Sequence, residues 1–282
     1  MPSDAPLSIP TVPLADGFTM PLVGLGTYPM KGAGAVSAVA SALEQGYRLI
    51  DTATQYGNER EVGEGLRASG VDRASVTIQT KLAGWDHVAG HAREGIERSL
   101  EALGVDQIDS YLIHWPNPSH DRYVEAWQAM VEARDAGLLR SIGTSNFKPA
   151  HIDRLVAETG VVPVVNQIQL SPVLARRGPL AYAAEHAIVV QAWGPLGQRE
   201  DLLSSPVLAA VAAEVGRSPE QVALRWIVRQ GIVVLPKSSH PDRQRANADL
   251  FGWDLADEQA ARLDLLDLGE ASAWDADTHE ET

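Results

Sequence analysis

Short apolar runs alternate with segments of helical spacing along this chain, and this alternation restricts its fold more than any other feature. Most of the runs are apolar enough to be parallel strands that are buried on both faces. We predict eight strands, at residues 22–28, 47–53, 76–82, 108–115, 141–146, 164–170, 189–195 and 233–238.

Between these runs, apolar residues recur at the spacing of one helix face, as at Ile96, Leu100 and Leu103. A strand followed by a helix, repeated eight times, predicts a (β/α)₈ barrel, because right-handed crossovers place each helix outside a sheet that closes on itself. Such a barrel takes about 250 residues. The 282 residues therefore predict an α/β fold with one TIM-barrel domain over residues 1–282.

Two further pieces are expected outside this repeat. Residues 9–12 and 18–20 predict a β-hairpin that plugs the amino-terminal mouth of the barrel. Residues 257–267 predict an extra helix near the carboxyl terminus. The tail from Gly269 onward is acidic, and we expect it either to cross the open mouth or to be disordered.

Composition limits the classes of function. The formal net charge of −14 disfavours nonspecific binding to nucleic acid or anionic membranes. The absence of cysteine excludes disulfides and thiolate metal sites. We find no apolar segment of membrane-spanning length and no recognisable signal peptide. The sequence thus favours a cytoplasmic protein that acts on a small molecule; we expect a monomer, although the oligomeric state stays open.

Four polar residues stand at or just beyond the ends of predicted strands: Asp51, Tyr56, Lys81 and His114. Side chains at the carboxyl ends of barrel strands meet at one rim. A tyrosine can exchange its proton near neutrality only if its phenolate is stabilised, by roughly 4 kcal/mol. We expect Lys81 to supply the stabilising cation, Asp51 to hold Lys81, and His114 to orient a substrate oxygen. This cluster predicts proton transfer to an oxygen, with no metal.

Proton transfer to oxygen is half of a carbonyl reduction, and the hydride must come from a cofactor because no side chain carries one. Ser145, Asn146 and Gln167 have groups of the kind that bind a carboxamide. Trp193 offers a face on which a flat ring can stack. Cationic and polar side chains near the eighth run suit a phosphate monoester better than a ribose diol. They are Lys237, Ser238, Arg243 and Asn247, next to Pro236.

The chain resembles the aldo-keto reductase superfamily in seven stretches, which occur in the family's order and spacing over almost its whole length. They are GYRLIDTATQYGNEREVG, TKLAG, DSYLIHWP, RSIGTSNF, VVNQIQLSP, QAWGPLG and VLPKSSHPDRQRAN. Through HWPNP and WGPLGQ it most resembles bacterial members related to 2,5-diketo-D-gluconic acid reductase.

This resemblance implies a barrel that reduces aldehydes or ketones with NADPH. It implies Tyr56 as the acid, tuned by Lys81 and Asp51, and it places His114 beside the carbonyl. It also implies that the carboxamide is held by Ser145, Asn146 and Gln167, the nicotinamide by Trp193, and the 2′-phosphate by Lys237, Ser238 and Arg243. We further assign to the cofactor site Gly26, Thr27, Asp51, Gly194, Pro195, Leu196, Ser239 and Asn247.

Three positions depart from the family pattern. Ala83 and Ser171 stand where many relatives have tryptophan and histidine, and Ala246 stands where a glutamate commonly contacts the adenine. We expect Ala83 to open the substrate pocket. The pocket residues that we predict are Tyr28, Trp85, Trp115 and Asn117.

Other interpretations were weighed. Singly, Asp51 suits a helix cap, His114 a core histidine and Tyr56 a surface residue, but their coincidence at strand ends favours catalysis. A nicotinamide-binding sensor or regulatory subunit without turnover is the alternative function, and a phosphate-handling isomerase is a third. Glycines 24, 26, 32 and 34 make only a weak dinucleotide fingerprint. We assign His87 and His91 to a solvated helix rather than a metal site, and Asn58 and Glu59 to a helix cap.

Overall fold

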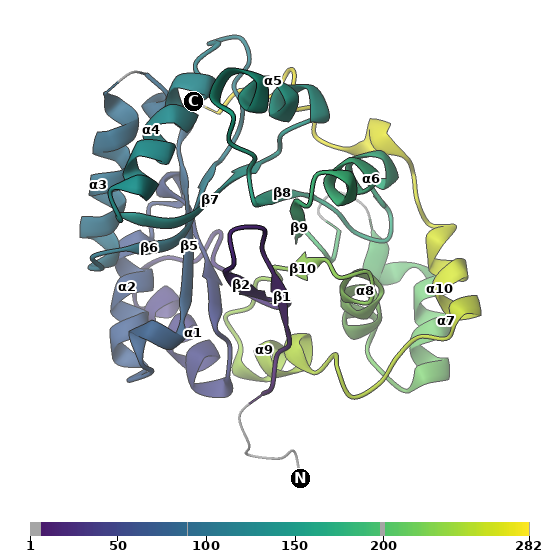
Figure 1. Ribbon diagram of the computed structural model, residues 1–282. Coiled ribbons are helices and arrows are strands. Elements are labelled where there is room, and N and C mark those ends of the chain that lie inside the picture. Colours follow the sequence, from purple (N-terminus) through teal and green to yellow (C-terminus); the bar gives the residue numbers. More distant parts are fainter. Residues whose placement is uncertain (1–6, 89, 198–200, 282) are drawn as a thin grey trace.

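The computed structural model describes residues 7–88, 90–197 and 201–281 (Figure 1). Eight parallel strands form one sheet in the order β10-β9-β8-β7-β6-β5-β4-β3. Parallel bridges from Val23 to Val234 and from Gly26 to Lys237 join its two ends, so the sheet closes into the predicted (β/α)₈ barrel. The strands are β3 (Leu25–Gly26), β4 (Leu49–Asp51), β5 (Thr77–Leu82), β6 (Ile108–Ile113), β7 (Leu139–Ser145), β8 (Val165–Gln169), β9 (Val189–Trp193) and β10 (Val233–Val234).

Helices follow each strand and surround the sheet (Figure 1). Two of them, α7 and α8, follow β9. Trp127 of α4 is fully buried in the core. None of the helices in the described ranges is long and apolar enough to cross a membrane. The helices are α1 (Gly32–Gln45), α2 (Glu59–Ala68), α3 (His91–Leu103), α4 (Tyr123–Asp135), α5 (Pro149–Thr159), α6 (Arg177–Glu185), α7 (Pro206–Val215), α8 (Pro219–Val228), α9 (Pro241–Ala248) and α10 (Asp257–Asp264).

The first and last barrel strands are shorter than predicted. A β carbon on Gly26 would lie 2.8 Å from the carbonyl oxygen of Leu235, so these two segments approach each other more closely than side chains allow. Pro236 follows directly and has no N–H for a strand ladder. The regular pairing of β3 with β10 therefore stops early, and both chains enter the rim as loops.

The predicted hairpin is present, offset by one or two residues, as β1 (Thr11–Pro13) and β2 (Thr19–Pro21). Its turn needs a left-handed backbone at Gly17, where φ is 85°. Leu14 and Met20 are buried against residues at the amino-terminal ends of the strands, such as Leu49 and Val233. In Figure 1 the hairpin lies across the front of the barrel, which it closes at this end.

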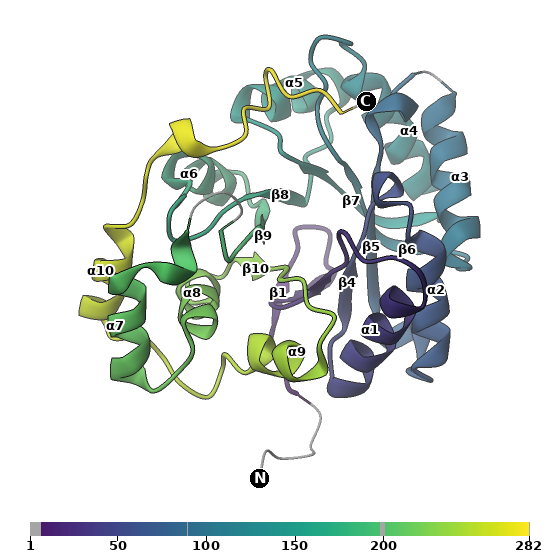
Figure 2. The same cartoon turned by 180° about the vertical axis from the view of Figure 1, so that it is seen from behind.

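The carboxyl-terminal segment packs against the opposite face (Figure 2). The extra helix α10 ends three residues before the predicted end, because the chain there turns to bond the loop after β8. Asp267 accepts from the Ala175 amide at 3.1 Å, and the Leu268 amide donates to the Val173 carbonyl at 3.0 Å. A short 3₁₀ turn, Glu270–Ser272, follows. We call residues 273–281 the C-terminal strap. They run along the mouth of the barrel, as in the first of the two predictions, in which the tail crosses the mouth.

Candidate active site

A cavity of about 710 Å³ opens at the carboxyl ends of the barrel strands. This volume lies within the usual range of small-molecule sites, about 300–1,000 Å³. Most of the predicted site residues line it. Its walls are Gly26, Thr27, Tyr28, Asp51, Gln55, Tyr56, His114, Trp115, Ser145, Asn146, Gln167, Trp193, Gly194, Pro195, Leu196, Gly197, Leu235, Pro236, Lys237, Trp274 and His279.

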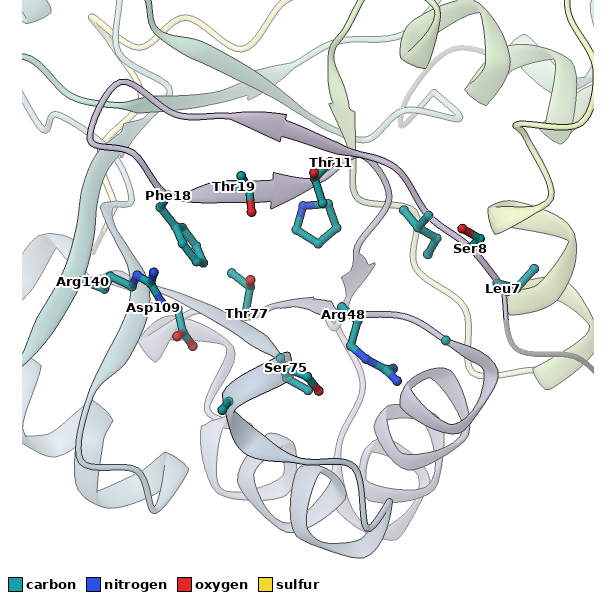
Figure 3. A pocket seen from close by; sticks show the side chains of 15 residues that line it. Leu7, Ser8, Thr11, Phe18, Thr19, Arg48, Ser75, Thr77, Asp109 and Arg140 are labelled. Carbon is teal, nitrogen blue, oxygen red and sulfur yellow. The ribbon is translucent and has the colours of Figure 1, made fainter.

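A second cavity, of about 420 Å³, lies at the other end between the hairpin and the barrel floor (Figure 3). Its charged side chains already have partners. Asp109 pairs with Arg73 at 2.7 Å and accepts from the Ile78 amide at 2.9 Å. The Arg140 guanidinium lies 4.1 Å from the centre of the Phe18 ring. Because these groups satisfy one another, we place the chemistry in the larger cavity.

A buried ion pair forms the floor of the larger cavity. Lys81 is fully buried, and its Nζ donates to both Asp51 oxygens at 2.8 and 2.9 Å and to the Thr52 carbonyl at 2.8 Å. Asp51 Oδ1 also accepts from Gln79 at 2.7 Å and from Gln167 at 3.0 Å. Burial lowers the pKa of Lys81, and the Asp51 carboxylate opposes that effect. The pair is thus fixed on every side.

Tyr56 stands beside this pair, at the end of a 3₁₀ turn, Thr54–Tyr56, that follows β4. Its ring centre lies 5.1 Å from Lys81 Nζ and 5.6 Å from the centre of the His114 ring. Burial raises the pKa of Tyr56 well above its usual value, and the Asp51 and Glu281 carboxylates raise it further. We expected Lys81 to stabilise the phenolate, but burial and the two carboxylates shift this pKa in the opposite direction. The phenol therefore keeps its proton.

His114 is held by a residue that the sequence did not point to. Its Nδ1 lies 2.6 Å from Oε1 of Glu281 in the C-terminal strap, and both side chains are buried. A carboxylate can only accept, so Nδ1 carries the proton and Nε2 is the ring nitrogen left for a substrate. Glu281 Oε2 accepts from the Gly84 amide at 2.8 Å. Only the expectation that the tail crosses the mouth could have suggested this contact.

The residues assigned to a nicotinamide ring are brought together on the β7–β9 side of the cavity. Trp193 Nε1 donates to Asn146 Oδ1 at 2.8 Å, and Asn146 Nδ2 donates to the His114 carbonyl and to Ser145 Oγ, each at 3.0 Å. Gln167 lines the same wall and is buried. An indole and amide groups, in a cavity that Lys237 also lines, fit a nicotinamide dinucleotide.

Four residues assigned to the cofactor site lie outside the cavity wall. Ser239 and Arg243 are exposed beside the start of α9, and Asn247 is buried within that helix. Ser238 is also buried, and its hydroxyl is used locally: it donates to the His240 carbonyl at 3.2 Å and accepts from the His240 amide at 3.1 Å. Lys237 is the exposed cation that lines the cavity.

Two of the four residues predicted for the substrate pocket line the cavity, and two do not. Tyr28 and Trp115 line the cavity. Trp85 does not; it is 45% exposed on the surface turn Gly84–Asp86. Asn117 is fully buried, and its side chain donates to the Glu281 carbonyl at 2.8 Å and accepts from the Glu281 amide at 3.0 Å. It therefore anchors the strap rather than a substrate.

The strap supplies the wall that the sequence missed. Trp274 and His279 line the cavity, and their rings lie 6.1 Å and 4.1 Å from the Trp115 ring. Ala83, expected to open the pocket, is fully buried, and a β carbon on the adjacent Gly84 would lie 2.6 Å from the Glu281 carbonyl oxygen. The strap thus fills the space beside Ala83.

The structure contradicts two predictions about residues outside the site, the capping role of Asn58 and the solvated-helix position of His87. Asn58 precedes α2, but its side chain does not cap that helix; it accepts from Thr52 Oγ1 at 2.6 Å and donates to the Met30 carbonyl at 3.0 Å. His87 is not on a solvated helix with His91, because it precedes α3 and is buried. Burial lowers the pKa of His87 to about 4, so the ring is neutral.

Ion pairs hold the strap to the start of α5. Lys148 Nζ contacts Asp275, and it lies 2.5 Å from Asp277 Oδ2. Lys148→Met should therefore release the strap and speed amide exchange in residues 273–281, measured by hydrogen-exchange mass spectrometry. Lys148 lowers the pKa of Asp275, so its hold is present above the ordinary aspartate value of 3.8 and is lost as the pH falls below it.

The matched control for this release is Arg93→Met, which removes a surface ion pair with Glu97 on α3. It should leave exchange in residues 273–281 unchanged. Equal exchange in the Lys148→Met variant and the parent would show that the strap does not depend on these ion pairs.

Comparison with known proteins extends these local findings to the whole chain. The Aldo/keto reductase family matches over residues 22–267. The chain is 45% identical to 2,5-diketo-D-gluconic acid reductase B of Corynebacterium sp. (strain SHS752001) over 274 residues, which cover 97% of this chain and 99% of that protein. It is 41% identical to methylglyoxal reductase DkgA of Escherichia coli (strain K12) over 270 residues, covering 95% and 98%.

Solved structures agree. The Gox0644 D53A mutant in complex with NADPH has a TM-score of 0.92 at 35% identity, covering 97% of this chain and 99% of that one. An aldo/keto reductase from Brucella melitensis has a TM-score of 0.89 at 41% identity, covering 92% and 100%. The resemblance noted in the sequence is confirmed.

Proposed function

Since the chain belongs to the aldo/keto reductase family, we propose that this oxidoreductase uses NADPH to reduce an aldehyde or ketone to an alcohol. The observation that carries this proposal is the buried Lys81–Asp51 pair at the floor of the larger cavity, beside Tyr56 and His114. A protein that only bound the cofactor would have no use for a phenol held in this way.

Tyr56 is the proton donor in this proposal. Its raised pKa keeps the phenol protonated, which a general acid requires before it acts. Lys81 Nζ lies 5.1 Å from the centre of the Tyr56 ring and is held there by Asp51, so the buried pair orders the site around the phenol. The His114 ring, 5.6 Å from that of Tyr56, bounds the space for the carbonyl oxygen.

The cofactor, when bound, supplies the hydride for the carbonyl carbon. Asn146, Ser145 and Gln167 would hold its carboxamide, and Trp193 would stack on the ring. Lys237 would pair with its 2′-phosphate, and Arg243, exposed near the start of α9, would assist. A relative of known structure is described as a complex with NADPH, which supports this choice.

We expect the parent protein to oxidise NADPH in the presence of glyoxal or 4-nitrobenzaldehyde, and to use NADH less well at equal concentration. Replacing Lys237 and Arg243 by alanine should raise KM for NADPH at least tenfold, since about 1.4 kcal/mol of phosphate binding would be lost. The KM for NADH should stay near its parent value, because NADH has no 2′-phosphate.

Two outcomes would contradict the proposal. Equal use of NADPH and NADH by the parent would exclude a phosphate site at Lys237. Fluorescence quenching by NADPH without its oxidation, over a broad panel of carbonyl compounds, would favour the sensor or regulatory subunit instead.

A further inference from the structure

The C-terminal strap places a buried carboxylate, that of Glu281, against His114, one of the residues that line the cavity. Glu281 is 2% exposed. Its Oε1 is bonded to His114 Nδ1 at 2.6 Å, and its Oε2 accepts from the Gly84 amide at 2.8 Å. Its backbone is fixed from both sides by the Asn117 side chain. The carboxylate is thus built into the site rather than lying loosely on its rim.

The two carboxylates near Tyr56, those of Asp51 and Glu281, differ in their bonded partners. The cation of that region, Lys81, donates two hydrogen bonds to Asp51, so its charge is already matched. The two bonded partners of Glu281 are a backbone amide and an imidazole, neither of which is a lysine or arginine. Both Asp51 and Glu281 act on the Tyr56 phenol. Glu281 therefore places a second carboxylate near the space that a substrate carbonyl would occupy beside Tyr56.

Burial makes this charge effective. A carboxylate in a largely desolvated site is screened much less than one in water, and a second negative charge brought close to it there is strongly repelled. A substrate with a carboxylate next to its carbonyl would bring a second anion close to Glu281. An uncharged carbonyl compound of the same skeleton would have no such cost.

We propose that Glu281 determines the substrate class: it admits uncharged carbonyl compounds and excludes those with a carboxylate beside the carbonyl. This inference rests on the proposed reductase function, because it concerns the same site. The rings of Trp115, Trp274 and His279 form an aromatic wall of the same cavity, which suits the flat, apolar part of an uncharged ligand.

The test compares pyruvate with ethyl pyruvate, which share a ketone and differ by one negative charge. In the parent we expect kcat/KM to be much higher for the ester. Glu281→Gln should raise the ratio of pyruvate to ester at least tenfold, or about 1.4 kcal/mol, mainly through a lower KM for pyruvate. The ratio cancels any general opening of the mouth, which would affect both compounds.

Glu280→Gln is the matched control, since it removes the same charge from the preceding residue, whose Oε1 accepts from the Ser119 amide at 3.1 Å. It should leave the ratio unchanged. An unchanged ratio in Glu281→Gln, or an equal change in both variants, would overturn the inference. Glu281→Met, which adds no amide donor, repeats the test if the glutamine variant is unstable.

A binding measurement separates this inference from the proposed function. Pyruvate should bind the Glu281→Gln protein loaded with the oxidised cofactor, NADP⁺, at least tenfold more tightly than it binds the NADP⁺-loaded parent, measured by tryptophan fluorescence. If the parent reduced no carbonyl compound, the proposed function would fail, and this binding comparison would still decide the role of Glu281. If the parent reduced the ester but the two proteins bound pyruvate equally, only the inference would fail.

Discussion

Tyr56→Phe is expected to lower kcat for carbonyl reduction by at least about 100-fold, because a positioned general acid contributes roughly 10²–10⁴ to the rate. The substitution removes the hydroxyl and leaves the ring, which lies 5.0 Å from the ring of Tyr28 and 5.6 Å from that of His114. NADPH should still quench the protein's fluorescence as in the parent. Steady-state kinetics with 4-nitrobenzaldehyde would measure the loss.

Tyr182→Phe is a suitable control, because that hydroxyl bonds Asp153 on the outer helices at 2.6 Å and lies outside the cavity wall. Its kcat should match the parent's. If Tyr56→Phe retained near-parent kcat, Tyr56 would not be the acid, and the proton would have to come from another group or from water.

The second large effect is expected on stability. Asp51→Asn leaves the Lys81 ammonium fully buried without its carboxylate partner. Breaking a buried ion pair from one side costs about 3–5 kcal/mol. The free energy of unfolding, from urea or guanidinium titration, should fall by this amount, and carbonyl reduction should be lost with it because Tyr56 loses its organised neighbour.

The double variant Asp51→Asn/Lys81→Met provides the control, since it removes both charges. It should be more stable than the single variant, because no unpaired charge stays buried. A loss below about 1 kcal/mol in Asp51→Asn, the size of an exposed salt bridge, would show that the pair is not desolvated in solution.

Much of the site could be predicted because it lies at strand ends. Asp51 ends β4, Lys81 is the next-to-last residue of β5, and His114 follows β6. Because parallel strands end at the same rim, their direction was enough to place these residues together. Their types then indicated acid-base chemistry. The structure brings them together with Tyr56 around one cavity.

The electrostatic balance was harder to predict. The sequence suggested that Lys81 would lower the pKa of Tyr56, whereas burial and the carboxylates of Asp51 and Glu281 raise it. The largest cause is the burial of Tyr56, which depends on how the loops and the C-terminal strap pack around it and which no sequence pattern reports.

The barrel, its hairpin and the acid-base cluster could be predicted from the residues, because each follows from a repeating pattern of apolar residues or from the direction of neighbouring strands. What closes the cavity could be seen only in the folded structure. Glu281 contacts His114 across 167 positions of sequence. Asn117, which we predicted to line the substrate pocket, instead binds the strap. Such a contact has no repeat to reveal it: it depends on an irregular tail finding complementary charges and hydrogen bonds on a folded surface.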